Sequence, residues 1–93
     1  MIRSFATKET AALFANQRVR CFSADWLPVA RRKLAQLNRI VSIEELRLPP
    51  GNRLERLAGD RAGQWSLRIN DQWRLCFAWR DGHAWEVEIV DYH

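Results

Sequence analysis

The side chains of this sequence that suit acid–base and phosphate chemistry lie around one predicted turn and at the last residues. Arg68 and Arg74 flank the turn Asn70-Asp71-Gln72, and the chain closes with Asp91-Tyr92-His93. Guanidinium groups bind phosphate with a planar fork of donors, while a phenol and an imidazole can exchange protons. Together they suit RNA cleavage. In that reaction a base removes the 2′-OH proton, the 2′-oxygen attacks the adjacent phosphate and an acid protonates the leaving 5′-oxygen. Such chemistry requires no metal or cofactor, and DNA, which has no 2′-OH, cannot undergo it.

The two arginines are placed by a predicted β-hairpin between Gly59 and Arg80. Apolar and polar residues alternate on both sides of the turn, which is typical of half-buried strands. The two apolar sets share one face only if the loop has an odd number of residues, because a one-residue slip sends every side chain to the other face. A three-residue loop places Arg68 directly opposite Arg74. Like charges in that position are destabilising, so the pair requires an anion.

A third predicted strand, Ala84 to Tyr92, brings carboxylates to the same face. A three-residue turn, Asp81-Gly82-His83, would pair Trp79 with Trp85, Phe77 with Val87, and Leu75 with Ile89. The opposite face would then collect Arg68, Asn70, Arg74, Cys76, Glu86, Glu88 and Tyr92. Two interpretations stay open: Glu86 or Glu88 neutralises the arginines within the fold, or an RNA phosphate does so during function. Likewise, Tyr92 could only pack against the sheet, and His93 is a terminal residue, where chains fray.

The remaining sequence predicts helices that cover the apolar face of this sheet. An edge strand at Met1–Phe5 is followed by a helix from Lys8 to Asn16, which Thr7 caps. A second helix is capped by Asp25 and ends near Ile40. A short helix that begins at the capping box Ser42–Glu45 and a modest strand at Arg53–Ala58 complete this part. In the second helix, Trp26, Ala30, Leu34, Leu37 and Val41 recur at helical spacing. The prediction is an α+β two-layer fold in which an N-terminal strand and two main helices pack on an antiparallel sheet of about four strands.

Composition narrows the class of protein. The 93 residues, of which 47% are hydrophobic, predict one domain over residues 1–93 with a compact core. No stretch approaches the ~20 apolar residues of a membrane span, and the first residues show no export signal, so we expect a cytoplasmic protein without a membrane partner. Cys21 and Cys76 are far apart and are expected to be free thiols, with no metal-binding spacing.

The charge is basic and uneven. The formal net charge is +4, from thirteen Arg, two Lys and 11 acidic residues. Residues 1–47 carry nine basic and four acidic residues, whereas residues 48–93 carry six and seven. The first half could therefore face a nucleic acid or an acidic protein, although GC-rich codon usage would also favour Arg over Lys. The run Arg31-Arg32-Lys33 on the second helix is either a solvated face or a contact for a partner or ribosomal RNA.

Several strings of this sequence resemble one family. PPGNRLERLAGDRAGQWSLRINDQWRLCFAW and the closing VEIVDYH are similar to the HigB family of bacterial toxins, in the RelE superfamily, as are MIRSF, KET and ARRKL nearer the start. The resemblance covers essentially the whole chain. It implies a RelE-like fold and a metal-independent, ribosome-dependent mRNA endonuclease that works in the ribosomal A site. It also implies a HigA-type helix-turn-helix antitoxin as partner, with operator DNA contacted only through that antitoxin.

The resemblance also suggests roles for particular residues. Tyr92 and His93 match active-site positions, with Asp91 orienting the chain end, and Arg74 matches an arginine at the scissile phosphate. Arg68 and Asn70 lie in a segment that carries another active-site basic residue. Arg31, Arg32 and Lys33 would contact 16S ribosomal RNA or the antitoxin.

The sequence departs from the family in one place. Some relatives have a histidine in the strand before the GDR turn and a lysine just before its glycine, and this chain has neither. Glu55 or Arg56 could substitute, or the general base is Tyr92 or His93, so base and acid stay unassigned and weak activity is conceivable. Two rival functions remain: a non-catalytic module that binds the antitoxin and modulates operator binding, and a ribosome-binding regulator that does not cut.

Overall fold

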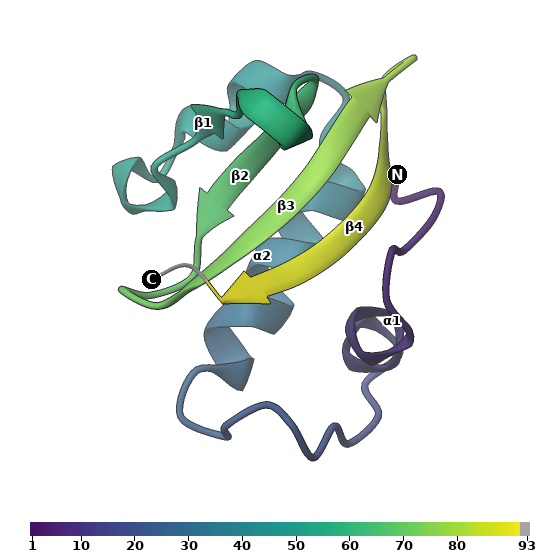
Figure 1. Cartoon of the computed structure of the whole chain (residues 1–93), viewed down its shortest axis with the longest axis vertical. Helices are drawn as coiled ribbons and strands as arrows, with labels where there is room; N and C mark the ends of the chain where they lie inside the picture. The colour runs from purple at the N-terminus through teal and green to yellow at the C-terminus, as the bar shows by residue number, and fades with distance from the viewer. Residues whose placement is uncertain (92–93) are drawn as a thin grey trace.

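The computed structural model describes residues 1–91 of the chain. Two α-helices, α1 (Lys8–Phe14) and α2 (Leu27–Arg39), precede a sheet of four strands. The strands are β1 (Glu55–Arg56), β2 (Gln64–Arg68), β3 (Trp73–Arg80) and β4 (His83–Asp91). Three short 3-10 helices lie in the connections: η1 (Ile43–Arg47) and η2 (Pro50–Asn52) between α2 and β1, and η3 (Gly59–Arg61) between β1 and β2. The sheet is an antiparallel meander in the order β1-β2-β3-β4, and α2 runs across one of its faces (Figure 1). The predicted α+β architecture is confirmed.

The first hairpin has the register that parity predicted. Leu67 pairs with Leu75, and Arg68 lies directly opposite Arg74. Leu67, Leu75 and Phe77 are fully buried on the face that packs on the helices. Because the three-residue loop keeps the apolar residues of both strands on one side, the arginines are both directed to the other side.

The second hairpin differs from its predicted register. The turn has two residues, Asp81 and Gly82, both with positive φ, so Arg80 pairs with His83 and Trp79 with Ala84 rather than with Trp85. Consecutive positive-φ residues are typical of the tight turns that match strand twist.

A β-bulge then corrects the register further along β4. Cys76 pairs with Glu88 and Ala78 with Trp85, so β4 has one extra residue, and Glu86 there has a φ of 54°. Beyond the bulge the predicted pair Leu75–Ile89 is present. Val87 and Ile89 are buried as predicted, but Trp85 is not in the core. Its indole stacks against Arg80, with the guanidinium carbon 4.9 Å from the ring centroid.

The helices begin and end close to their predicted positions. Thr7 caps α1 by accepting a hydrogen bond from the Thr10 N–H. For α2, however, the cap residue is Trp26, and the predicted Asp25 cap is wrong, since no side chain makes a capping bond there. Val41 was placed on the buried face of α2 but is 80% exposed, because the helix ends at Arg39 and Ile40 turns into the core instead.

The first residues close the outer edge of β4. Ile2 and Phe5 form isolated parallel bridges to Ala84 and Val87, so the predicted edge strand is reduced to these two bridges. In Figure 1 this N-terminal segment lies beside β4, opposite β1 at the other edge of the sheet. Among residues 1–91, no helix is long and apolar enough to cross a membrane.

Candidate functional site

The two predicted phosphate-binding arginines lie at the end of the sheet where β4 finishes. The turn between β2 and β3 and the last residues of β4 are at the same end in Figure 1. Val90 pairs with Arg74 and Asp91 with Trp73, so the described chain ends one residue beyond the row of the arginines. Tyr92 and His93, the predicted acid–base residues, lie outside the described residues.

Arg74 is held firmly on the outer face of the sheet. Its Nε donates to Ser66 Oγ at 2.9 Å and its Nη2 donates to the Arg53 carbonyl at 2.8 Å. Its Nη1 is 3.8 Å from a carboxylate oxygen of Glu55, on the neighbouring β1. The side chain is only 11% exposed. The guanidinium is therefore fixed in position by two neutral acceptors and also lies near the carboxylate of Glu55.

Arg68 is held within its own turn. Its guanidinium forms an ion pair with Asp71, three residues later, and Asp71 itself is almost fully exposed. An exposed pair of this kind contributes little to stability and can be exchanged for another anion. Both arginines thus have carboxylate partners, as one of the two interpretations required.

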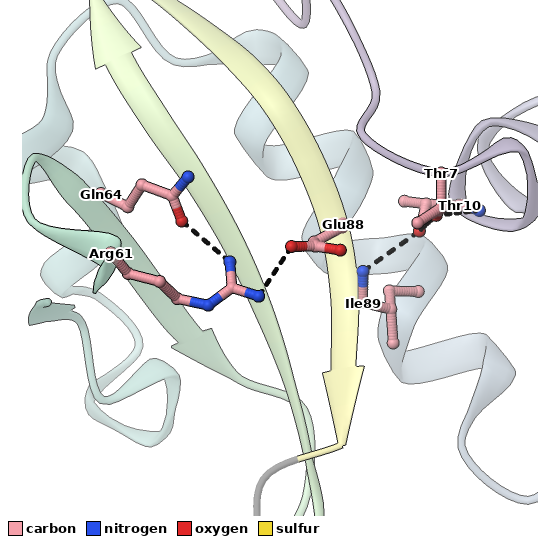
Figure 2. A network of polar contacts seen from close by, with 6 residues as sticks. All are labelled: Thr7, Thr10, Arg61, Gln64, Glu88 and Ile89. Carbon is pink, nitrogen blue, oxygen red and sulfur yellow. Dashed lines mark hydrogen bonds and ion pairs between the residues drawn. The ribbon is translucent and has the colours of Figure 1, made fainter. Parts of the chain in front are cut away.

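The carboxylates are not the ones that the sequence suggested. Glu88 is paired with Arg61 at 2.8 Å, and Arg61 also donates to Gln64 Oε1 at 3.0 Å (Figure 2). Glu86 lies in the bulge, is exposed and belongs to no ion pair among residues 1–91. The suggested pairing of Glu86 or Glu88 with the two arginines was therefore wrong. The bulge moves Glu86 away, and Arg61 of η3 binds Glu88.

The predicted supporting residues fall into different environments. Asn70 shapes the turn, since its Oδ1 accepts from the N–H groups of Gln72 and Trp73 at 2.9 and 2.8 Å. Asp91 accepts from Gln72 Nε2 at 3.1 Å, which ties the end of β4 to the same turn. Arg56 lies over the ring of Trp65 at 5.7 Å, toward the β1 edge.

The three consecutive basic residues of α2, Arg31 to Lys33, do not form one surface. Arg32 and Lys33 line a groove of about 570 Å³ together with Arg39 and Arg68, whereas Arg31 is not part of that lining. Lys33 Nζ donates to Asn52 Oδ1 at 2.8 Å. Burial, and then the charges of Arg32, Arg68 and Arg74, lower the pKa of Lys33 below its usual range. Successive helical residues point about 100° apart, which separates Arg31 from the groove.

A cysteine also lies beneath the outer face of the sheet. Cys76 is fully buried, and burial raises the pKa of its thiol. The charges of Arg61, Glu88 and Arg74 also act on it, which places all three around this part of the face. The sequence had placed Cys76 on an open face, but Cys76 and Ser66 are both covered.

Several residues near the arginine pair could not be recognised from the sequence pattern. Asn52 is only 1% exposed and its amide group donates to Gln36 Oε1 and to the carbonyls of Leu46 and Leu48. The spacing of Arg32, Gln36 and Arg39 at i, i+4 and i+7 could have shown that they share one helix face. Nothing local in the sequence indicated that Asn52 would contact Gln36, or that the Arg53 carbonyl would accept from Arg74.

Comparisons with known proteins agree with this architecture. A family model described as a RelE-like toxin of type II toxin–antitoxin system HigB matches residues 3–93. Endoribonuclease HigB of Proteus vulgaris is 30% identical over 93 residues, all of both chains. Toxin HigB-1 of Vibrio cholerae is 49% identical over 53 residues, which is 57% of this chain and 56% of that protein, so this match spans about half of each.

Solved structures share the fold. The YoeB–YefM complex from Staphylococcus aureus contains a chain that superposes with a TM-score of 0.62 at 18% identity, covering 100% of this chain and 98% of that chain. A heterotetrameric YoeB–YefM toxin–antitoxin complex from the same organism gives 0.61. The resemblance inferred from the sequence strings is thereby confirmed. The chain belongs to the HigB family, the RelE-like toxins of type II toxin–antitoxin systems.

Proposed function

We propose that this toxin is an endoribonuclease that enters the ribosomal A site and cuts mRNA during translation without a metal ion. The observation that carries the proposal is the pair of arginines directly opposite each other at one end of the sheet. Arg74 has its guanidinium fixed by two neutral oxygens at 2.9 and 2.8 Å, which holds its donors in place on the outer face of the sheet. The full-length similarity to a protein named Endoribonuclease HigB supports the same activity.

In the proposed reaction the 2′-oxygen forms a bond to the adjacent phosphorus, and the bond to the 5′-oxygen of the next nucleotide breaks. The products are a 2′,3′-cyclic phosphate and a 5′-hydroxyl. Arg74 and Arg68 bind the phosphate and stabilise the charge of the phosphorane, because fixed donors aimed at developing charge need no reorganisation. As RNA binds, its phosphate replaces the weakly held carboxylates of Glu55 and Asp71.

Tyr92 and His93 supply the general acid and base, with Asp91 orienting the chain end. Glu55 is the alternative base, since its carboxylate is more than half exposed and already lies beside Arg74. It also occupies the strand in which some relatives carry a histidine. A base and an acid in fixed positions typically contribute about 10²–10⁴-fold each to the rate.

Partners follow from the charge distribution and the family. Arg31, on the basic first half of the chain, contacts 16S ribosomal RNA. A HigA-type antitoxin neutralises the toxin and carries the complex to operator DNA. Because the substrate is mRNA on ribosomes, the site of action is the cytoplasm.

The test is expression without antitoxin, followed by mapping of mRNA 5′ ends. We expect new ends within translated frames, and their loss in Arg74→Ala and in a variant that lacks Tyr92 and His93. Arg20→Gln removes one exposed charge elsewhere and serves as the control. Growth arrest that survives both changes would refute the assigned site. Unchanged mRNA ends would favour a non-catalytic module that binds the antitoxin, or a ribosome-binding regulator. Naked mRNA cut at the same rate as translated mRNA would refute ribosome dependence.

A further inference from the structure

A groove beside the arginine pair carries a second concentration of positive charge. It runs between α2, η2 and the end of β2, and has a volume of about 570 Å³. Its lining contains four cationic side chains and no acidic one: Arg32, Lys33, Arg39 and Arg68. Among residues 1–91, the ion pairs include none to Arg32, Lys33 or Arg39. Surface cations are normally scattered among carboxylates, so four in one concave site without an acid indicate an anionic ligand.

Lys33 is positioned in this groove without being neutralised. Its ammonium donates to Asn52 Oδ1 at 2.8 Å, and that amide is almost fully buried. Asn52 cannot rotate freely, because its Nδ2 donates to Gln36 Oε1 and to the carbonyls of Leu46 and Leu48 at 3.1 to 3.2 Å. The cation is thus anchored by a neutral acceptor that is itself locked by the chain.

The electrostatics of Lys33 agree with this geometry. Loss of hydration and the nearby positive charges of Arg32, Arg68 and Arg74 all lower its pKa. Each of these causes disfavours a charged amine at this point, and a bound anion would relieve the repulsion. The remaining lining includes apolar groups of Val29, Ala35, Pro49 and Ile69, against which a sugar or base could lie.

We propose that this groove binds a phosphodiester of the same RNA strand, next to the phosphate held between Arg68 and Arg74. The inference rests on the proposed ribonuclease function. Arg68 connects the two places, because it lines the groove and also lies directly opposite Arg74. A strand bound at the arginine pair would therefore continue into the groove. Lys33 and Arg32 are RNA-positioning residues in this scheme, and the groove sets which way the strand runs over the site.

Binding of a short RNA that cannot be cut tests the groove separately from cleavage. The probe is a fluorescent oligoribonucleotide with a 2′-O-methyl group at the cleavage position, titrated over a series of salt concentrations. Each lost phosphate contact reduces the slope of log K against log salt by about 0.7 for single strands. We expect a slope smaller by about 0.7 in Lys33→Gln and in Arg32→Gln, with roughly tenfold weaker binding at low salt. Arg20→Gln, which lies outside the groove, should leave the slope of log K against log salt unchanged.

The position of the second phosphate can be found with a neutral linkage. A single methylphosphonate is moved along the oligonucleotide, and at one linkage adjacent to the cleaved bond the effect of Lys33→Gln should disappear. Thermal melting of each variant checks folding, and Arg32→Gln, an exposed side chain, keeps the test valid if Lys33→Gln unfolds.

Other outcomes would overturn the proposal. Equal slopes in Lys33→Gln, Arg32→Gln and the native chain would do so. If the two variants lose affinity for ribosomes without mRNA but not for the oligonucleotide, the groove belongs to ribosomal RNA. If only the antitoxin complex weakens, it belongs to an acidic protein segment. Failure of the ribonuclease function is distinguishable, because it would abolish cleavage in the native chain while leaving the salt slopes measurable.

Discussion

Replacing Arg74 separates its structural role from its chemical one. In Arg74→Ala, Ser66 Oγ and the Arg53 carbonyl lose their donor at the outer face of the sheet. Hydrogen bonds to charged groups are worth about 1.5–3 kcal/mol each, but the opening at the neighbouring exposed Glu55 lets water replace part of the loss. We therefore expect a cost of about 2 kcal/mol, or a melting temperature lower by about 8–16 °C for a chain of this size.

That cost leaves the variant folded at working temperature. A small protein is usually stable by about 5 kcal/mol or more, so about 3 kcal/mol would remain and fewer than about 1% of molecules would be unfolded. Unfolding could then not reduce activity measurably. Loss of one donor that stabilises transition-state charge typically lowers kcat by about 10²–10³-fold, and this is the effect expected for Arg74→Ala.

The matched control is Ser66→Ala. It removes the 2.9 Å bond to Arg74 but keeps the guanidinium and its bond to the Arg53 carbonyl. We expect a cost of about 1 kcal/mol and an activity within about tenfold of the native chain. Cleavage on translating ribosomes is measured by primer extension under single-turnover conditions, beside a thermal melt of each variant. If Arg74→Ala remains folded and cuts within threefold of the native rate, the assignment of Arg74 to the scissile phosphate is wrong.

Three further predictions concern groups outside the arginine pair. Thr10 Oγ1 accepts from the buried Ile89 N–H at 3.1 Å (Figure 2), so Thr10→Val should cost about 1–3 kcal/mol in urea unfolding while Thr10→Ser costs less; equal effects would show that only packing matters. Burial raises the pKa of the Cys76 thiol, so iodoacetamide should modify only the exposed Cys21 in the native chain and both thiols in denaturant. Incorporation of only one equivalent of iodoacetamide in denaturant would contradict this. The free energy of unfolding should also fall as the pH rises above the ordinary thiol range, because the unfolded chain loses that proton first. Backbone N–H groups lower the pKa of Glu45, so its carboxylate stabilises the fold at neutral pH and this stabilisation is lost as the pH falls through the lowered pKa. In Glu45→Gln, the free energy of unfolding should therefore fall less steeply with decreasing pH. An unchanged dependence on acid pH would rule this out.

The register of the first hairpin could be predicted from the sequence, because the number of loop residues alone decides which side chains share a face. Arg68 could be set opposite Arg74 from the alternation and an odd loop. The same logic failed at Trp85, where a two-residue turn and the bulge at Glu86 each change the register and together restore it by Ile89. A bulge is a local choice of backbone that alternation does not encode, so only the far end of the strand could be predicted.

At the candidate site, the sequence predicted that Arg68 and Arg74 lie opposite each other, but it did not predict which residues bind them. The partners of the arginines are Glu55 and Asp71, and each depends on where a loop places a short side chain. Asn52 was unpredictable for a similar reason, because its four bonds come from α2, η1 and the segment that follows it. Contacts between elements distant in sequence have no signature in local pattern.

The docking of the first residues along β4 also determines when the molecule can form. The Arg3 N–H bonds to the Ala84 carbonyl at 2.7 Å and the Glu86 N–H to Ser4 Oγ at 2.8 Å, so these contacts join residues about eighty positions apart. During synthesis, residues 2–5 stay unpaired until residues 84–87 have been made, and contacts of such long sequence separation slow folding. Newly made chains therefore pass through a stage in which the beginning of the protein is complete but has no strand on which to dock. Pulse-labelled nascent chains should be protease-sensitive up to that length.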